Sequence, residues 1–371
     1  MKIAYLANIR FPSERAHAAQ IAHMCQALVE KGAEVDLIVN ERVVCDKKEI
    51  DTYFGFPIKF TVSRLPISWI FPKSKVGYYF GELCFAILFI LKKRHHKYDV
   101  ILSRSDWLLY FLSFFFDTKK LLWESHEARL VFPARKILKK GVKTVVISEG
   151  IYEDYLEYGI SKKQMMIAHD GIEKSFFVNA DKRDIVRDKL GLSKEDKIVM
   201  YIGGFDEWKG IRTFCSAAEL CPKVKFVAIG GREEQVMSFS RQYPLVTFLG
   251  ALPYKDLKHN QQAADILVVP NTAKTKLSSR YTSPLKLFAH MASGIPLLVS
   301  DVKSIVTVTG NELVTVFKAD NHRSLADGVK AILSEPKTYK DRARQLKEVS
   351  KQYLWTNRAE QILKFIDCHR L

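Results

Sequence analysis

The sequence has few cysteines, and no pair of them is spaced for a zinc or redox site. Its six cysteines are scattered over 371 residues without a C-x-x-C pair. This pattern favours a reducing compartment, so we expect a cytoplasmic protein. The opening MKIAYLANIR has no small-residue cleavage site before the polar RFPSERAH, so we interpret it as a first strand rather than a secretory signal.

Repeats, Gly/Ser-rich linkers and low-complexity segments are also missing. Hydrophobic residues make up 47% of the chain and charged residues 27%, which is typical of soluble globular proteins. A chain of 371 residues exceeds what one hydrophobic core usually organises. We therefore expect two domains, each with its own core.

Positive charge is concentrated in one part of the chain. The formal net charge is +17, with 58 Lys and Arg against 41 Asp and Glu. Residues 59–143 hold 17 basic and 6 acidic residues, or +11, which leaves +6 for the other 286 residues. A nucleic acid, a membrane or merely a basic surface would fit such an excess.

Strand-like apolar runs alternate with helical segments through both halves. The first series starts at 2–9 and continues through 34–40, 98–104, 119–125 and 143–149, and a second series starts at 197–204. This alternation predicts βαβ units and parallel sheets, once in each half. We expect a first domain over 1–170 and a second domain over 171–350, followed by a charged C-terminal helix at about 351–371.

The stretch RYTSPLKLFAHMASGIPLLVS at 280–300 predicts a ligand-binding helix. Ser283 reads as an N-cap with Pro284 as the first helical residue, and Gly294 fits a left-handed C-terminal position, so the helix spans about 284–293. Lys286 and Ala289 would share a face apart from the core-facing stripe. Free amides at the helix start, with Arg280 and Lys286 nearby, favour an anion. A capped surface helix with solvated cations is the alternative.

Two glycine turns support the anion interpretation. YIGGFDEWKGIRTF at 201–214 ends a strand with Gly203 and Gly204 and reaches Lys209 at the next helix. AIGGRE at 228–233 repeats this arrangement on a neighbouring strand. Because open α/β sheets bind ligands at the carboxyl ends of their strands, these turns and the helix after Ser283 together predict a diphosphate site.

These segments resemble the retaining glycosyltransferases of family 4. The resemblance runs over nearly the whole chain, through RFPSERAHAAQ, WESH, VVISEGI, AHDGI, YIGG with WKG, AADILVVPN, SPLKLF with MASGIP, and YLWTNRAEQIL. It implies the GT-B fold, in which two doubly wound Rossmann-like α/β domains face an interdomain cleft. The domain over 1–170 would then lie on the acceptor side, with the C-terminal helix at about 351–371 packed back on it, and the domain over 171–350 would bind the nucleotide sugar. It also implies transfer of a sugar from a nucleoside diphosphate sugar to a saccharide or lipid-linked acceptor, in surface polysaccharide or glycolipid assembly.

The resemblance also implies roles for single residues. Lys209 would contact the donor diphosphate and His126 would face the donor sugar, so these two are the predicted catalytic residues. Arg15, His17 and Gln20 would border the acceptor. The family often has an arginine where Gly204 stands, which leaves Lys209 as the main cation. The residues predicted to bind the donor are Gly203, Gly204, Arg232, Arg280, Tyr281, Ser283, Pro284, Leu285, Lys286 and Ala289.

Two positions depart from the family pattern. Members usually carry two glutamates eight positions apart, one at the donor sugar and one at the ribose, where this chain has Tyr281 and Ala289. A different hold on the ribose, weak activity or an introduced alanine would each explain Ala289. A carboxylate there would accept charge-assisted hydrogen bonds, so Ala289→Glu is expected to tighten nucleotide binding about tenfold or more. A catalytically degenerate partner protein is the alternative function, and a nucleotide-sugar epimerase is a further one.

The predicted reaction needs neither a metal nor another cofactor. The sequence contains no D-x-D triplet. Glu124, His126 and Glu127 lie close in sequence, but further metal ligands are missing nearby, so we do not predict a metal site. His126 could equally be a core histidine.

The basic segment 59–143 predicts a possible docking site on an anionic membrane. VGYYFGELCFAILFIL at 76–91 is interrupted by Glu82 and is too short to span a bilayer comfortably. It is either a buried crossover helix or part of a peripheral membrane surface, together with Trp69, Ile70 and Phe71. We do not expect nucleic-acid binding, because no recognition motif accompanies the cations.

Overall fold

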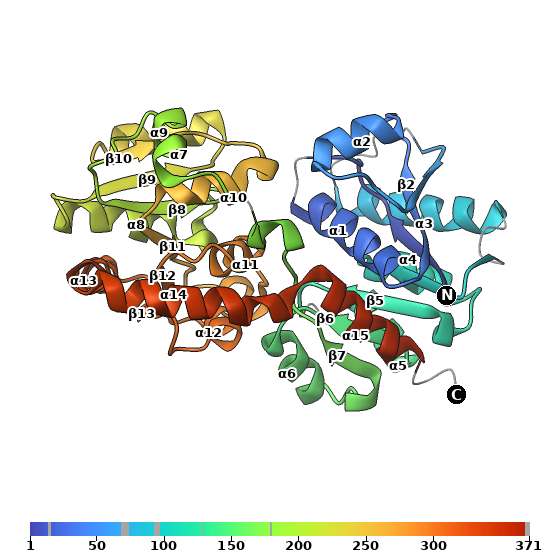
Figure 1. Cartoon of the computed structure of the whole chain (residues 1–371). Helices are drawn as coiled ribbons and strands as arrows, with labels where there is room; N and C mark the ends of the chain where they lie inside the picture. Colours follow the sequence, from blue (N-terminus) through green and yellow to red (C-terminus); the bar gives the residue numbers. More distant parts are fainter. Residues whose placement is uncertain (14–15, 68–73, 93–96, 129, 179, 368–371) are drawn as a thin grey trace. The chain divides into compact units, whose positions relative to one another are not determined.

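The computed structural model describes residues 1–371 except 14–15, 68–73, 93–96, 129, 179 and 368–371, and it divides the chain into two compact units (Figure 1). Unit 1 comprises Met1–Asp170 with Trp355–Leu371, and unit 2 comprises Gly171–Leu354. The chain therefore crosses between the units twice. At these crossings the Ile172 amide donates to the Tyr353 carbonyl at 2.9 Å, and Ile172 pairs with Leu354 in a parallel bridge.

Unit 1 is built on a parallel sheet with the strand order β3-β2-β1-β4-β5-β6-β7. Its strands are β1 Lys2–Ala7, β2 Glu34–Asn40, β3 Thr61–Leu65, β4 Val100–Ser103, β5 Leu121–Ser125, β6 Lys143–Val146 and β7 Met165–Ile167. Its helices are α1 Ala16–Glu30, α2 Lys47–Phe54, α3 Lys75–Leu91, α4 Asp106–Leu112, α5 Phe132–Lys139, α6 Glu149–Glu157 and α15 Trp355–Asp367. The order reverses between β1 and β4, which is the switch point of a doubly wound fold.

Helices cover the sheet of unit 1 in a pattern set by its connections. Because parallel crossovers are right-handed, α1 and α2 belong to one face of the sheet and α3 to α6 to the other. Helix α15, from the end of the chain, packs against α1 (Figure 1). On the other side α3 contacts α4, and α4 contacts α5.

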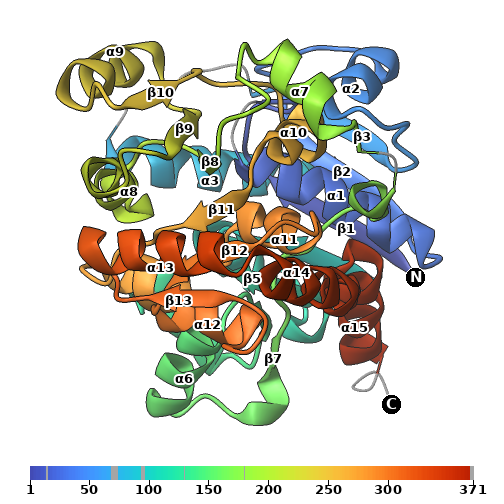
Figure 2. The same cartoon turned by 60° about the vertical axis from the view of Figure 1, so that its left-hand side comes forward.

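Unit 2 repeats the design with the strand order β10-β9-β8-β11-β12-β13, again in parallel. Its strands are β8 Ile198–Ile202, β9 Lys225–Ile229, β10 Val246–Phe248, β11 Ile266–Val269, β12 Leu297–Ser300 and β13 Thr315–Phe317. Its α-helices are α7 Arg183–Lys189, α8 Ile211–Ala217, α9 Glu233–Gln242, α10 Leu257–Asn260, α11 Leu285–Met291, α12 Lys303–Thr309, α13 His322–Ser334 and α14 Pro336–Ser350. Figure 2 shows α12 and α13 bordering β12 and β13.

The central strands of both sheets are buried on both faces. All four residues of β11 and of β12 are buried, as are five of the six in β1. Such strands are continuous apolar runs, because helices cover both sides of a parallel sheet. The predicted doubly wound α/β class is therefore confirmed for each unit.

The predicted start of the helix after Ser283 is wrong. A π-helical turn, Leu277–Tyr281, precedes it, and Pro284 has an extended backbone with φ −77° and ψ 119°. Pro284 is therefore the N-cap rather than the first helical residue, and no side chain caps α11. Gly294 does adopt the predicted left-handed conformation, with φ 77°.

Candidate functional site

Two glycine turns pack against each other at the carboxyl edge of the unit 2 sheet. Gly203 follows β8 with φ 153°, and Gly230 follows β9 with φ 127°. The Gly203 amide donates to the Ile229 carbonyl at 2.9 Å, and a Cβ added at Gly230 would lie 2.0 Å from the Gly203 carbonyl oxygen. Only glycine permits this approach, so the sequence brings bare backbone to the end of two adjacent strands.

Lys209 lies over the first of these turns. It ends a 3₁₀ turn, Glu207–Lys209, and its Nζ lies 2.7 Å from Asp206 Oδ2 and 2.7 Å from the position of a Cβ on Gly204. The hydrogen bond from Lys209 lowers the pKa of the Asp206 carboxyl. The Lys209 side chain is 25% exposed, so the ammonium remains within reach of a ligand.

Lys286, on α11, lies against the neighbouring glycine of the same turn. Its Cδ lies 3.5 Å from the position of a Cβ on Gly203, and its Nζ lies 4.4 Å from the centre of the Tyr201 ring. Within the described part of the chain this buried Nζ has no hydrogen-bond partner. Burial, followed by the positive charge of Lys209, lowers the pKa of Lys286 to about 7. Two lysine side chains thus lie against one glycine turn, which is an arrangement that suits an anion.

A third strand contributes a residue that the sequence did not single out. Asn271 follows β11 and Pro270, is fully buried, and among the described residues neither its Oδ1 nor its Nδ2 has a hydrogen-bond partner. Gly210 packs on this strand end so closely that a Cβ there would lie 1.6 Å from the Pro270 oxygen. The position of Asn271 after a buried parallel strand was the available signal, because such strand ends meet at one edge.

The other residues predicted to bind the donor have different surroundings. Arg232 is exposed at the start of α9, and its charge is among those that lower the pKa of Asp206. Arg280 and Tyr281 belong to the π-helical turn, where Ser278 Oγ donates to the Trp208 carbonyl at 2.9 Å and so holds the turn beside Lys209. The remaining residues belong to the N-terminal end of α11 or precede it: Ser283, Pro284 and Leu285.

Ala289 lies in the hydrophobic core of unit 2. It is fully buried in an apolar cluster that includes Phe288, Met291 and Val299. The prediction that its face is separate from the core stripe is therefore wrong, because α11 is buried nearly all round.

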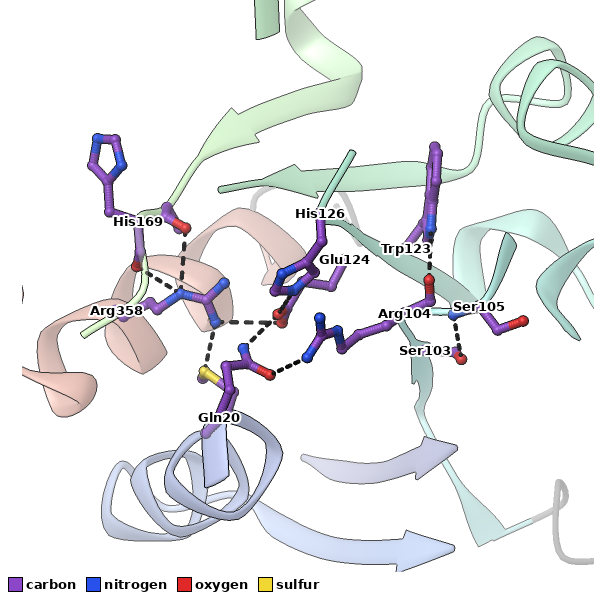
Figure 3. Close-up of polar contacts among 11 residues, drawn as sticks. Gln20, Ser103, Arg104, Ser105, Trp123, Glu124, His126, His169 and Arg358 are labelled. Atoms are coloured by element: carbon purple, nitrogen blue, oxygen red, sulfur yellow. Dashed lines mark hydrogen bonds and ion pairs between the residues drawn. The ribbon is translucent and has the colours of Figure 1, made fainter. Parts of the chain in front are cut away.

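Unit 1 contains a buried polar cluster around Glu124, drawn in Figure 3. Glu124 Oε1 accepts from Gln20 Nε2 at 2.6 Å and lies 2.7 Å from His126 Nε2, while Glu124 Oε2 lies 3.3 Å from an Arg358 nitrogen. Arg104 donates to Gln20 Oε1 at 3.2 Å. Arg358 reaches this cluster from α15 and also donates to the carbonyls of Ala168 and His169, at 3.3 and 2.8 Å.

The electrostatics of this cluster fix its charge states. Burial alone would raise the pKa of Glu124, but Arg358, His126 and Arg104 together hold it well below its usual range. Burial and the charge of Arg104 lower the pKa of His126 against the pull of Glu124. Glu124 is thus an anion and His126 a neutral imidazole at pH 7, with the side chain of His126 18% exposed.

The residues predicted at the acceptor separate into three cases. Gln20 is buried, and both its amide nitrogen and its amide oxygen form hydrogen bonds within the Glu124 cluster. His17 is half-buried near the start of α1. Arg15 lies outside the described residues. No group of three His, Cys, Asp or Glu side chains in the described residues is placed to hold a metal ion.

Residues 182–351 match the family model for glycosyl transferases group 1. This match covers most of unit 2. A curated relative, the N,N'-diacetylbacillosaminyl-diphospho-undecaprenol alpha-1,3-N-acetylgalactosaminyltransferase of Campylobacter jejuni, is 25% identical over 234 residues. That alignment spans 60% of this chain and 59% of the relative, so it covers less than two thirds of that protein.

Solved structures extend the likeness to the fold of both units. Sucrose-phosphate synthase from Thermosynechococcus elongatus superposes with a TM-score of 0.79 at 20% identity, covering 99% of this chain and 98% of the other. HepE from Anabaena, solved in complex with UDP-glucose, gives 0.73 at 15% identity, covering 99% and 100%. The chain therefore has the GT-B fold, in which each of its two units is a doubly wound α/β domain.

Proposed function

We propose that this protein transfers a hexosyl group from a nucleoside diphosphate sugar to a saccharide or lipid-linked acceptor, with retention of configuration, in assembly of a surface polysaccharide or glycolipid. The observation that carries the proposal is the pair of lysines, Lys209 and Lys286, whose side chains lie against the Gly203–Gly204 turn. The group 1 match over residues 182–351 supports the same reaction class.

The chemistry explains why two cations belong there. Breaking the anomeric C–O bond places negative charge on the departing diphosphate, and a catalyst gains most by stabilising that charge where it develops. Lys209 and Lys286 supply positive charge without a metal ion, so the proposal includes no metal or other cofactor. Asn271 adds an amide whose buried donor and acceptor have no partner among the described residues.

The names of the relatives support the donor and acceptor classes of the proposal. The Anabaena structure contains UDP-glucose, and the Campylobacter enzyme is named for a diphospho-undecaprenol acceptor. Within unit 1 we assign His126, held by Glu124, to the donor sugar, and Arg15 and His17 to the acceptor. Gln20 then acts by orienting Glu124 rather than by touching the acceptor. We place the reaction in the cytoplasm.

The test has a binding step and a turnover step. Calorimetry with UDP, GDP and ADP should identify one tightly bound nucleotide, and turnover is then followed as release of that diphosphate from its sugar conjugates. Lys209→Ala should lower turnover about 100-fold, by analogy with the loss of one preorganised donor. The matched control is Lys223→Ala, an exposed lysine of the same unit, which should leave turnover unchanged. Near-normal turnover of Lys209→Ala would exclude Lys209 from this role.

A degenerate binding or partner protein is the second candidate, because Ala289 is an apolar core residue where the family usually has a glutamate. This second candidate predicts that the protein binds a nucleotide but neither hydrolyses nor transfers any sugar conjugate of that nucleotide. Turnover of any one donor decides in favour of the enzyme.

A further inference from the structure

Helices α3, α4 and α5 of unit 1 carry a set of exposed apolar side chains, which we call the aromatic–lysine face. Phe114 is 60% and Phe115 68% exposed at the end of α4, and Leu91 is 68% exposed at the end of α3. The full apolar set is Val76, Tyr78, Phe80, Ile87, Leu91, Phe114, Phe115, Val131 and Phe132. Large exposed apolar groups gathered over three neighbouring helices mark an interaction surface rather than the scattered apolar exposure of ordinary surfaces.

Ring contacts make this surface continuous from helix to helix. Tyr79 of α3 lies 4.2 Å from Trp107 of α4, between ring centres. Tyr110 of α4 lies 5.1 Å from Phe114 and 5.2 Å from Phe132 of α5. The exposed residues at the N-terminal end of α3 are thereby connected to those of α4 and α5.

The chain segment that carries this face is strongly cationic. Nine cations between residues 75 and 140 are exposed, whereas Asp117 is the one exposed carboxylate among the described residues of that range. Two of the lysines lie on exposed rings, with Lys140 Nζ 4.1 Å from the centre of Phe114 and Lys136 Nζ 5.6 Å from that of Phe132. The nine are Lys75, Lys92, Lys97, Lys119, Lys120, Arg135, Lys136, Lys139 and Lys140.

Helix α3 is neither a fully buried crossover helix nor a membrane span. Its inner stripe, which includes Gly81, Phe85 and Phe89, is buried against unit 1, while Val76, Tyr78, Phe80, Ile87 and Leu91 are exposed. In the described residues no helix has the length and apolar character needed to cross a bilayer. Trp69, Ile70 and Phe71, which the sequence also suggested for a membrane surface, lie outside the described residues.

We propose that the aromatic–lysine face docks on the surface of a membrane that contains anionic lipids. Aromatic side chains favour the headgroup region of a bilayer, and lysines beside them pair with anionic headgroups while their aliphatic stems lie on the rings. Charge argues against a second copy of the chain, which would bring nine cations against nine. Apolar contact argues against a nucleic acid, which would leave the aliphatic side chains Val76, Ile87 and Leu91 without a partner.

The docking proposal does not depend on sugar transfer. It places the protein beside a lipid-linked acceptor but is tested by lipid binding alone. Failure of the vesicle experiment would therefore leave the proposed reaction intact, and a lack of turnover would leave the docking surface intact.

The experiment is flotation of the full chain with vesicles of phosphatidylcholine, with and without phosphatidylglycerol. The charge variant carries Lys119→Gln, Lys120→Gln, Lys136→Gln and Lys139→Gln. Its matched control removes four exposed lysines of unit 2, by Lys223→Gln, Lys225→Gln, Lys337→Gln and Lys340→Gln. The apolar variant, Leu91→Ser with Phe115→Ser, is compared with Leu245→Ser and Val349→Ser, which are exposed in unit 2.

We expect binding to anionic vesicles that high salt weakens, and no binding to neutral ones. The charge variant should lower the partition coefficient about tenfold or more, since each lysine near an anionic surface contributes roughly fivefold before screening. The apolar variant should lower it as well, and both unit 2 controls should bind like the parent protein. Unchanged thermal unfolding shows that each variant folds. Equal binding to neutral vesicles, equal losses in the controls, or tighter binding to duplex DNA than to vesicles would each overturn the proposal.

Discussion

Replacing Lys286 by methionine should make the unliganded protein more stable and weaken its binding of a nucleoside diphosphate. Methionine is unbranched and apolar, so it can occupy the lysine stem's place beside the Tyr201 ring without bringing a charge into the interior. The wild-type ammonium is buried without a hydrogen-bond partner among the described residues. A bound diphosphate would supply the missing anion.

The magnitude follows from the pKa. Burial and the charge of Lys209 lower the pKa of Lys286 from 10.5 to about 7. Each pH unit corresponds to about 1.4 kcal/mol, so the charged form costs the folded state on the order of 5 kcal/mol. Between about pH 7 and 10.5 the unfolded chain binds more protons than the folded one, so the wild type gains stability as pH rises through this window. Below pH 7 the folded state bears the full free-energy cost of burying the charged Lys286 side chain.

Urea unfolding at pH 6 and pH 9 measures the stability effect. The free energy of unfolding of Lys286→Met should exceed that of the wild type by a few kcal/mol at pH 6 and by less at pH 9. Calorimetry at pH 8, in buffers that differ in ionisation enthalpy, should show proton uptake when UDP or GDP binds to the wild type and none in the variant. Lys223→Met, an exposed substitution in the same unit, should change neither quantity. A less stable Lys286→Met variant at pH 6 that binds nucleotide as tightly as the wild type would refute the reasoning.

Three other predictions concern buried groups. Burial raises the pKa of Glu82 to about 7, so the folded state loses stability as pH rises from about 4.5 to 7. In urea unfolding at pH 8, Glu82→Gln should therefore be more stable than the wild type by up to about 3 kcal/mol. A variant whose stability has the same pH slope as that of the wild type would contradict this. Arg358→Met should lower the free energy of unfolding by about 3–5 kcal/mol, because it leaves the Glu124 carboxylate buried without its cation. Adding Glu124→Gln should recover part of that loss. Equal stability of the single and double variants would argue against the pairing. Ala289→Glu should lower the urea midpoint, because it places a carboxylate in the core, and Lys286 three residues away should offset part of this loss. We do not expect it to tighten nucleotide binding, as the sequence suggested. Tighter binding at unchanged stability would disprove the core placement.

The central strands could be predicted from the sequence, whereas the edge strands β3 and β13 could not. Residues such as Ile266–Val269 form an unbroken apolar run because both faces of the strand are buried. Thr61–Leu65 and Thr315–Phe317 lie at the edges of their sheets, where only part of each strand is buried. Their mixed composition does not distinguish them from loops, so no sequence run marked them.

The same contrast applies to the candidate site. Gly203, Gly204 and Lys209 were predicted because they directly follow one strand, and Lys286 because it lies near the start of a helix. The N-cap at Ser283 failed because the preceding π-helical turn changes where the backbone becomes helical, which a local capping rule does not include. The ion pair of Arg358 with Glu124 joins residues 234 positions apart, and a one-dimensional pattern contains no signal for such a pair.

The double crossing of the chain affects the order in which the protein is completed during synthesis. The ribosome makes all of unit 2 before it makes Trp355–Asp367, the helix that packs on α1 and delivers Arg358 to Glu124. Until this helix emerges, a nascent unit 1 holds the Glu124 carboxylate without the cation of Arg358. A truncation before Trp355 would therefore damage the half of the molecule that is translated first.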